Sequence, residues 1–517
     1  MKSGLNTAWS PCPNASSNPR AKTVNLPHGN LNPSPPTPSP AGGEGVKKPT
    51  PLIDALMAYP ALGRRRFHMP GHAGWRIPAL EGMLADPLRY DLTELDGLDA
   101  LSHAEGCLLE SQQLAAEILG VRDSFYLVNG ASVGIQAGLL ALLKPGDKVL
   151  IPRNAHRSVM GGLILTGAWP VWCWPAYDEA TGLFGPLSPQ AVNTALAGDP
   201  AIRCVVVTSP TYEGVPSDIA ALSAVCRTHN ATLLVDEAHG SLFPFSDRLP
   251  PSACHARIPT DMNAGADVVV QSFHKAGGSL TQSAVASLPH GARVDRARFQ
   301  AALNTLQTTS PSYLLLASLE AALTYFGSPA GQDRLNLHLD ALENMPPPPA
   351  PWVWAHPFEG ADPMKRLLRL PGCPAETWAT WLEREGRLAF EALSRDGALY
   401  QFGIGLTAED LSFFSSRLVT LAGGAAAFAE QTVTPAAPVA TLPPTLPVQA
   451  LSPREAFFAG SEQVDDNAAV GRISADTVVR CPPGIPVVTP GEAISPSLLQ
   501  SAGHVAAEET LTWLCVK

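Results

Sequence analysis

The sequence predicts an α/β fold built on a mostly parallel β-sheet. Apolar strand-like runs such as Val268–Ser272 are continuous and do not alternate with polar residues. They alternate along the chain with helical segments, and several of them end in polar side chains. Continuous apolar strands that alternate with helices are typical of a parallel sheet whose two faces are both covered.

The expected elements follow in chain order from a short amphipathic helix at Pro51–Met57. Strands are expected from Ser124 onward and over residues 148–152, 169–174, 204–209, 233–236 and 268–272. Helices are expected over residues 104–119, 133–143, 188–197, 218–229 and 376–393, with one more that ends near Phe326. In open sheets of this kind, ligands bind beyond the carboxyl ends of the strands.

Composition divides the chain into four expected regions. Residues 1–50 are rich in Pro, Ser, Asn and Gly, lack the apolar core of a secretory signal, and are expected to be a disordered leader. Residues 51–330 are expected to contain an N-terminal segment and a large domain. A smaller α+β domain over 331–440 and a C-terminal domain over 441–517 follow, and the proline-rich stretch 346–351 marks a linker or rigid loop.

Charge and cysteine usage exclude several classes of protein. Lys and Arg total 35 and Asp and Glu total 46, so the net charge of -11 argues against non-specific nucleic-acid binding and is compatible with a cationic substrate. The nine cysteines form no C-x-x-C pair, so neither a disulfide framework nor a zinc site is expected. No apolar run is long enough to cross a bilayer, and we expect a soluble cytoplasmic protein without a metal.

The stretch Asp267–Ser279 carries the main chemical signal. Lys275 follows a buried apolar strand and is flanked by small residues, so desolvation should lower its pKa and free its amine to attack a carbonyl. A solvated loop lysine is the alternative for this motif alone.

A second signal is the turn Asn129-Gly-Ala-Ser132 between a strand and a helix. Backbone N–H groups and the helix dipole at such a turn favour an anion, and the absence of a full nucleotide or dinucleotide motif points to a monophosphate. An ordinary strand-to-helix turn is the alternative. The loop that contains His68 and His72 has no third ligand, so loop hydrogen bonding is favoured over a metal site.

Several motifs together resemble one enzyme family. Asp236-Glu-Ala-His-Gly and Ser272-Phe-His-Lys275 are similar to the fold-type I pyridoxal-phosphate enzymes. More narrowly, the chain resembles the short form of the Orn/Lys/Arg basic amino-acid decarboxylases. The motifs that carry this resemblance occur in the same order as in the family: His68-Met-Pro-Gly-His, Asp91-Leu-Thr-Glu-Leu, Asn129-Gly-Ala-Ser, Arg153-Asn-Ala-His, Ser209-Pro-Thr-Tyr-Glu-Gly and the C-terminal Pro-Pro-Gly-Ile-Pro. The resemblance covers about 51–326 and 451–492, while Ala73 stands where the family usually has lysine.

The resemblance implies a fold-type I large domain with bound pyridoxal 5'-phosphate. Lys275 would bind the cofactor aldehyde, Asp236 would pair with the pyridine nitrogen, and His156 would stack on the ring. The remaining cofactor-binding residues implied by the resemblance are Ala131, Ser132, His239, Ser272, His274 and Thr308, with Ser310 behind Thr308. Thr308 would reach the phosphate from a partner subunit, so a homodimer with shared active sites is expected.

The implied reaction is decarboxylation of arginine, lysine or ornithine to agmatine or a diamine. Lys275 or His274 would return a proton to the α-carbon. The acidic candidates for the distal cation of the substrate are Asp91, Glu94, Asp99 and Glu492.

Two other classes of function stay open at this point. Another fold-type I activity, such as an aminotransferase or a lyase, would share the cofactor site. A catalytically silent binding homologue would keep only the scaffold, although the joint presence of Lys275, Asp236 and His156 argues against it.

Overall fold

The computed structural model describes residues 50–179, 181–254, 265–355, 358–431, 446–480, 484–503 and 513–517. Apart from Thr50, the expected leader lies outside these residues. The chain divides into two compact units, residues 1–61 and 62–517. In the first unit, α1 (Pro51–Ala58) confirms the expected helix, and Thr50 Oγ1 donates to Asp54 at 2.9 Å at its start.

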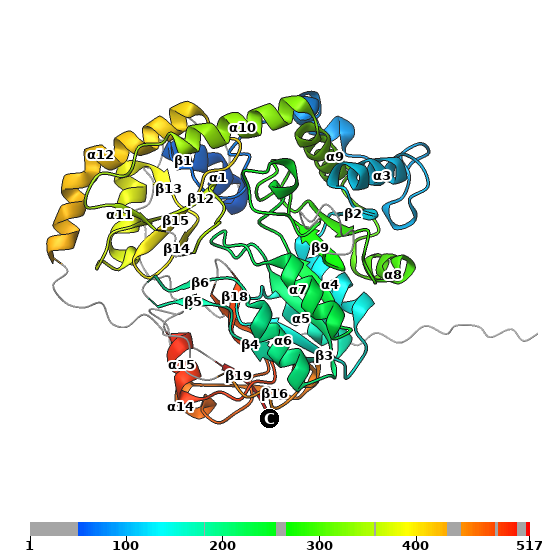
Figure 1. The fold of residues 1–517 in the computed structure, drawn as a ribbon. Helices are drawn as coiled ribbons and strands as arrows, with labels where there is room; N and C mark the ends of the chain where they lie inside the picture. Colours follow the sequence, from blue (N-terminus) through cyan, green and yellow to red (C-terminus); the bar gives the residue numbers. More distant parts are fainter. Residues whose placement is uncertain are drawn as a thin grey trace, which may run out of the picture. The chain divides into compact units, whose positions relative to one another are not determined.

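A seven-stranded sheet forms the centre of the second unit (Figure 1). Its order is β2 (Asp123–Leu127), β10 (Ala284–Leu288), β9 (Val268–Gln271), β8 (Thr232–Asp236), β7 (Ile202–Thr208), β3 (Lys148–Pro152) and β4 (Trp169–Cys173). β10 runs antiparallel to both of its neighbours, β2 and β9, and all other neighbouring strands of this sheet are parallel. The mostly parallel sheet predicted from the apolar runs is therefore confirmed.

Helices cover both faces of this sheet, as the buried strands require. One face packs on α4 (Gly130–Leu142), α5 (Ser158–Thr166) and α8 (Arg296–Leu306). The other packs on α3 (Cys107–Leu119), α6 (Pro189–Gly198), α7 (Ile219–Thr228) and α9 (Tyr313–Gly327), and α10 (Pro329–Glu343) follows α9. Successive strand residues alternate between the two cores: Val205 and Val207 face one and Val206 faces the other.

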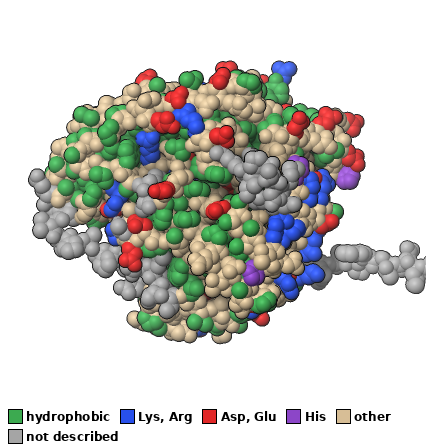
Figure 2. All heavy atoms as spheres, viewed as in Figure 1, with side chains coloured by type: hydrophobic (Ala, Val, Ile, Leu, Met, Phe, Trp, Pro, Cys, Tyr) green, Lys and Arg blue, Asp and Glu red, His purple; other side chains and the backbone are tan. Residues whose placement is uncertain are grey.

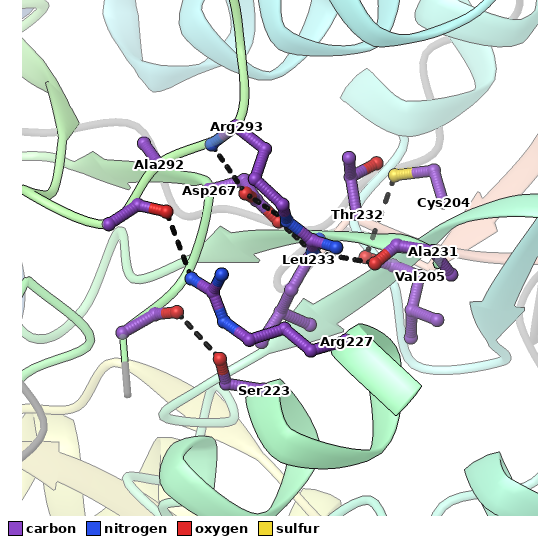
Figure 3. A network of polar contacts seen from close by, with 12 residues as sticks. Cys204, Val205, Ser223, Arg227, Ala231, Thr232, Leu233, Asp267, Ala292 and Arg293 are labelled. Atoms are coloured by element: carbon purple, nitrogen blue, oxygen red, sulfur yellow. Dashed lines mark hydrogen bonds and ion pairs between the residues drawn. The ribbon is translucent and has the colours of Figure 1, made fainter. Parts of the chain in front are cut away.

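A polar network fixes the amino-terminal edge of the sheet (Figure 3). The buried carboxylate of Asp267 accepts hydrogen bonds from Leu233 N at 2.8 Å and from the guanidinium of Arg293, whose Nη2 lies 2.7 Å away. Arg293 also donates to Ala231 O at 2.6 Å. This network ties the start of β9 to the start of β8, at the end of the strands opposite to Asp236 and Lys275.

A four-stranded antiparallel sheet forms a smaller layer. Its order is β11 (Val353–Ala355), β12 (Lys365–Arg369), β15 (Gly397–Gln401) and β14 (Ala392–Leu393), and α11 (Ala375–Gly386) packs against it. The prediction of a helix over 376–393 is wrong beyond Gly386. Arg387 adopts a left-handed conformation (φ 57°), and β13 (Leu388–Ala389) then pairs with β1 (Arg65–Arg66), so the chain leaves the helix for a strand.

One helix of the small region is long and apolar. By length and composition alone, residues 408–429 of α12 (Ala408–Gln431) could cross a membrane, the one such stretch in the part of the chain that the structure describes. Core helices of globular proteins meet the same criterion. Here Phe414, Leu418 and Ala425 are buried in the core, and α12 packs against α11.

The C-terminal residues form a compact layer with its own small core. Its helices are α13 (Pro453–Phe458), α14 (Asp466–Ala469) and α15 (Pro496–Gly503), and its strands are β16 (Ser461–Val464), β17 (Val478–Arg480), β18 (Ile485–Val488) and β19 (Trp513–Val516). Trp513, Ile494 and Leu498 are buried together. Helix α13 packs on α5, and Arg454 donates to Leu165 O at 2.9 Å.

Short elements complete the described chain. They are the hairpin β5 (Tyr177–Asp178) and β6 (Leu183–Phe184), helix α2 (Glu81–Ala85), and the 3-10 turns Tyr59–Leu62, Pro78–Leu80, Pro87–Tyr90, Leu101–His103 and Phe243–Phe245. On the face drawn in Figure 2, many acidic side chains lie along the upper side, and Lys and Arg side chains gather on the right of the view.

Candidate active site

Lys275 lies in the turn that follows β9. Its backbone N–H donates to Ser272 O at 3.1 Å, and its Nζ lies 3.0 Å from His239 Nε2. Burial lowers the pKa of Lys275, while the carboxylates of Asp236 and Glu391 act in the opposite direction. A larger fraction of the amine is therefore neutral, and nucleophilic, than in a solvated lysine.

Asp236 ends β8, the strand beside β9. It pairs in register with Val270, and it is only 5% exposed. Its Oδ1 accepts a hydrogen bond from Ala238 N at 3.1 Å. Because the two parallel strands end at the same edge, the structure brings Asp236 and Lys275 into one site, and the charge of Asp236 acts on both Lys275 and His156.

His156 lies in the loop after β3. Its Nδ1 accepts a hydrogen bond from Ser158 N at 3.2 Å, which leaves the ring proton of the neutral form on Nε2. Burial lowers the pKa of His156, partly offset by Asp236. On the C-terminal side, Gly484 O accepts from Arg157 N at 3.0 Å, and a Cβ added to Gly484 would lie 3.1 Å from the His156 ring.

The start of α4 and the turn after β9 supply polar groups suited to an anion. Ala131 and Ser132 occupy the first turn of this 13-residue helix and are partly buried. Ser272 is 1% exposed, and its Oγ is buried without a hydrogen-bond partner. Thr308 of the same chain lies beside the start of α4, since its N–H donates to Asn129 Oδ1 at 3.3 Å. Ser310 N lies 3.3 Å from Thr308 Oγ1.

His274 is held with a defined tautomer. Its Nδ1 lies 2.9 Å from Ser283 O, so Nδ1 carries the proton and donates it to that carbonyl. Burial lowers the pKa of His274 to about 4. The ring is therefore neutral at pH 7, with Nε2 left as an acceptor.

The loop with His68 and His72 meets the lysine turn through backbone contacts. Gly71 N donates to Lys275 O at 3.0 Å, and Gly405 N donates to Gly71 O at 3.1 Å. A Cβ on Gly71 would lie 2.5 Å from Lys275 O, and one on Gly403 would lie 2.4 Å from Gly71 O. Three segments far apart in sequence thus meet without intervening side chains.

The two histidines of this loop make local contacts. His68 Nδ1 lies 2.7 Å from Met69 O, and His72 Nδ1 accepts a hydrogen bond from Gly74 N. No cluster of metal-binding side chains occurs among the described residues.

Two side chains of the small region enter the site and were not identified from the sequence. Lys365, the first residue of β12, is 1% exposed, and its Nζ lies 2.7 Å from His239 Nδ1. Glu391 accepts a hydrogen bond from Met69 N at 2.7 Å and another from the hydroxyl of Tyr212. Lys365 lies between the two stretches that carry the family motifs, 51–326 and 451–492, and Glu391 fell within the helix predicted over 376–393.

The four acidic substrate candidates lie in different surroundings. Asp91 and Glu94 are exposed. The carboxylate of Asp99 accepts from the N–H groups of Glu105 and Gly106, at 3.0 and 2.7 Å, and so organises the start of α3. Glu492 is fully buried, and its Oε1 lies 2.5 Å from Arg153 Nη1. The carboxylates of Asp99 and Glu492 are thus occupied within the chain.

A mostly parallel seven-stranded sheet with Asp236 and Lys275 at the carboxyl ends of adjacent strands defines the fold-type I class of pyridoxal-phosphate enzymes. The P. aeruginosa lysine decarboxylase A structure has this fold: it superposes with a TM-score of 0.72 at 20% identity, covering 91% of this chain and 84% of that one. The Orn/Lys/Arg decarboxylase major-domain model matches residues 50–345, and the family's C-terminal domain model matches residues 439–507. The chain belongs to the Orn/Lys/Arg decarboxylase family, and it is therefore a basic amino-acid decarboxylase.

Curated relatives agree with this assignment over most of the chain. The arginine decarboxylase of Halalkalibacterium halodurans is 32% identical over 468 residues, covering 87% of this chain and 92% of that protein. The arginine decarboxylase of Bacillus subtilis is 33% identical over 460 residues, covering 86% and 91%. Pyridoxal phosphate is the cofactor expected for this family and fold, and a small-molecule amino acid is the substrate.

Proposed function

We propose that this protein decarboxylates arginine to agmatine with pyridoxal 5'-phosphate bound at Lys275. The observation that carries the proposal is the meeting of the Lys275 amine and the Asp236 carboxylate at the ends of β9 and β8. Arginine is favoured among the three basic substrates because relatives that match at 32% and 33% identity are named arginine decarboxylases.

The residues present fit this cofactor. The buried Ser272 Oγ has no hydrogen-bond partner, which suits a phosphate oxygen as its ligand. Lys275 has a lowered pKa, as capture of an aldehyde requires. Phosphate-binding residues would be Ala131, Ser132, Ser272, His274 and, from the same or a partner subunit, Thr308. His156 would stack on the ring and Asp236 would pair with its nitrogen.

The bound cofactor would accept the electron pair left on the α-carbon when carbon dioxide departs. Asp236 would keep the pyridine nitrogen protonated through its negative charge. The proton then returned to the α-carbon would come from Lys275. His274 is the poorer donor, because burial lowers its pKa to about 4 and its ring is neutral at pH 7.

The distal guanidinium of arginine would need an acidic partner. Asp91 and Glu94 are exposed and therefore available, whereas Asp99 and Glu492 would first have to give up their contacts within the chain. We also infer a homodimer in which an acidic or phosphate-binding residue crosses to the partner site. We also propose that the chain is divided into an N-terminal segment with a large domain over residues 51–330, a small domain over 331–440 and a C-terminal domain over 441–517.

The test is a substrate panel on the purified holoprotein. Arginine, lysine and ornithine are supplied separately, and carbon dioxide and the amine product are measured. Agmatine should form fastest. Preference for lysine or ornithine would overturn the arginine assignment, and keto-acid formation would indicate an aminotransferase. A protein that takes up no pyridoxal phosphate would indicate a silent binding homologue.

The covalent site is tested separately with borohydride. Reduction should fix the cofactor on the peptide that contains Lys275, and Lys275→Ala should abolish both the adduct and turnover. Lys148→Ala, at a half-exposed lysine that starts β3, is the matched control and should keep both. An adduct on another lysine would move the active site.

A further inference from the structure

Lys365 is a second buried lysine in the active site. Its Nζ lies 2.7 Å from His239 Nδ1, donates to the carbonyl oxygen of Tyr212, and lies 5.0 Å from the centroid of the Tyr212 ring. Tyr212 also packs edge-on against His239, with ring centroids 5.0 Å apart. Both rings and the lysine are thus held in one cluster.

The charges around Lys365 favour its protonated form at neutral pH. Burial lowers the pKa of Lys365 to about 8, while the carboxylates of Asp362, Glu391 and Glu213 act in the opposite direction and Lys275 adds to the lowering. Its contacts with the carbonyl oxygen of Tyr212 and with the face of the Tyr212 ring, 5.0 Å away, suit an ammonium group. An ammonium group donates hydrogen bonds and cannot accept them.

This donor fixes the tautomer of His239. Because Nδ1 faces an ammonium at 2.7 Å, Nδ1 must be the acceptor. Burial, together with the charge of Lys365, holds the pKa of His239 well below its usual value, so the ring is neutral and its single proton lies on Nε2. Nε2 is 3.0 Å from Lys275 Nζ, and an N–H donor at that position requires a lone pair on the lysine.

We propose that Lys365 is a positioning residue that holds His239 in its Nε2–H tautomer and thereby keeps the Lys275 amine neutral and oriented for reaction with an aldehyde. This inference rests on the proposed function, in which Lys275 carries the cofactor. Contact runs from Lys365, the first residue of β12, through the imidazole of His239 to Lys275 in the turn that follows β9. The small region therefore contributes to the reactivity of Lys275.

The first experiment reads the tautomer directly in the wild-type apoenzyme. Nitrogen-15 spectra of histidine-labelled protein are recorded, and the His239 signals are assigned by their loss in His239→Gln. A ring protonated only at Nε2 is expected. A ring protonated at Nδ1 would overturn the proposal without reference to any variant of Lys365.

The second experiment measures the reactivity of Lys275 in apoenzyme variants. Trace acetylation at a series of pH values, followed by peptide mass spectrometry, gives the titration midpoint of this amine. In Lys365→Met the His239 proton should no longer be confined to Nε2, and the midpoint should rise by about one unit, which leaves about tenfold less neutral amine at pH 7. In Lys365→Gln, whose amide can still donate to Nδ1, the tautomer should be retained.

Two comparisons complete the test. Lys148→Met should match the wild type in both measurements, since Lys148 is half exposed and pairs with Asp199 at the start of β3. An unchanged tautomer and midpoint in Lys365→Met would refute the inference. Failure of the proposed function is separate, because it would show as a wild-type holoprotein with no borohydride adduct at Lys275.

Discussion

Arg153 Nη1 lies 2.5 Å from Glu492 Oε1, and the two side chains are 4% and 0% exposed. Arg153 also donates to Val487 O at 2.8 Å and lies over the Trp172 ring, 4.6 Å from its centroid. This ion pair joins the C-terminal layer to the loop that carries His156. Its two partners belong to segments that are matched by separate domain models.

Glu492→Gln should therefore destabilise the protein strongly. The change leaves Arg153 as a buried charge without a carboxylate, which typically costs about 3–5 kcal/mol. Denaturant unfolding, followed by fluorescence, measures the loss. Glu462→Gln breaks the more exposed pair with Arg472 in the same layer and should cost no more than about 1 kcal/mol. Equal losses in the two variants would contradict this role for Glu492.

Gly484→Ala should lower turnover by displacing His156. Gly484 has a φ of +84°, and an added Cβ would lie 3.1 Å from His156 Cδ2 and Nε2. Small displacements of a group that positions the reactants can reduce kcat roughly tenfold to a hundredfold. The measurement is kcat together with the absorbance of the bound cofactor.

Gly471→Ala is the matched control for that variant. Its φ of +82° gives the same backbone strain, and no atom lies within 4 Å of its added Cβ. Both variants should lose similar stability, on the order of 1–2 kcal/mol. Only Gly484→Ala should lose turnover, and a similar kcat loss in Gly471→Ala would show that backbone strain alone is responsible.

Glu237 should make the stability depend on pH. Burial raises the pKa of Glu237 to about 8, although Ser252, Ala253 and Gln271 donate hydrogen bonds to it. The folded protein thus keeps a proton that the unfolded chain loses above about pH 4.3. The stabilisation is complete below that pH and is lost as the pH rises to about 8.

The predicted loss of stability with rising pH is checked by measuring the thermal unfolding midpoints of the wild type and of Glu237→Gln at pH 5.5 and 8.5. The wild type should lose stability relative to the variant as the pH rises, by roughly a few kcal/mol. Glu343→Gln, at a carboxylate that is 65% exposed, should leave the slope of the wild type unchanged. Parallel curves for Glu237→Gln and the wild type would disprove the raised pKa.

Asp267→Asn should affect stability and leave the chemistry intact. The carboxylate is 1% exposed and accepts from Arg293 and Leu233 at the start of the strand whose other end leads to Lys275 (Figure 3). Its loss should cost about 3–5 kcal/mol. Asp199→Asn, at a half-exposed pair with Lys148, should cost no more than about 1 kcal/mol. A large fall in kcat at a temperature where Asp267→Asn is fully folded would show that the Asp267 network also affects the active site at the opposite edge of the sheet.

The sequence was most informative where strands are apolar and end in polar groups. It located β8 and β9 to within a residue of their observed ends, and the family assignment followed from motifs at those ends. It did not identify β10, because an antiparallel strand inserted between β2 and β9 is a matter of long-range pairing that no local pattern records. The roles assigned to Lys275, Asp236, His156 and the phosphate-binding residues stay predictions.

The small region was harder to predict for physical reasons. Lys365 lies in a sequence that, taken locally, suggests a solvated lysine, and only the packing of β12 against Tyr212 and His239 buries it. Glu391 was hidden by a helical pattern that stops at Gly386, where tertiary pairing of β13 with β1 overrides local propensity. Asp99 and Glu492 were selected for their charge, which does not reveal whether a carboxylate is already engaged by backbone amides or by an arginine.

The glycine contacts around Gly71 have a mechanical consequence for the enzyme. Main chain meets main chain between the Met69–His72 loop, the turn of Lys275 and the segment after β15, so there is no side chain whose rotation could absorb a relative movement. A rigid displacement of the four-stranded sheet would be transmitted directly to the peptide group of Lys275. Adjustment of this sheet during the reaction cycle must therefore either carry the lysine along or bend the chain elsewhere.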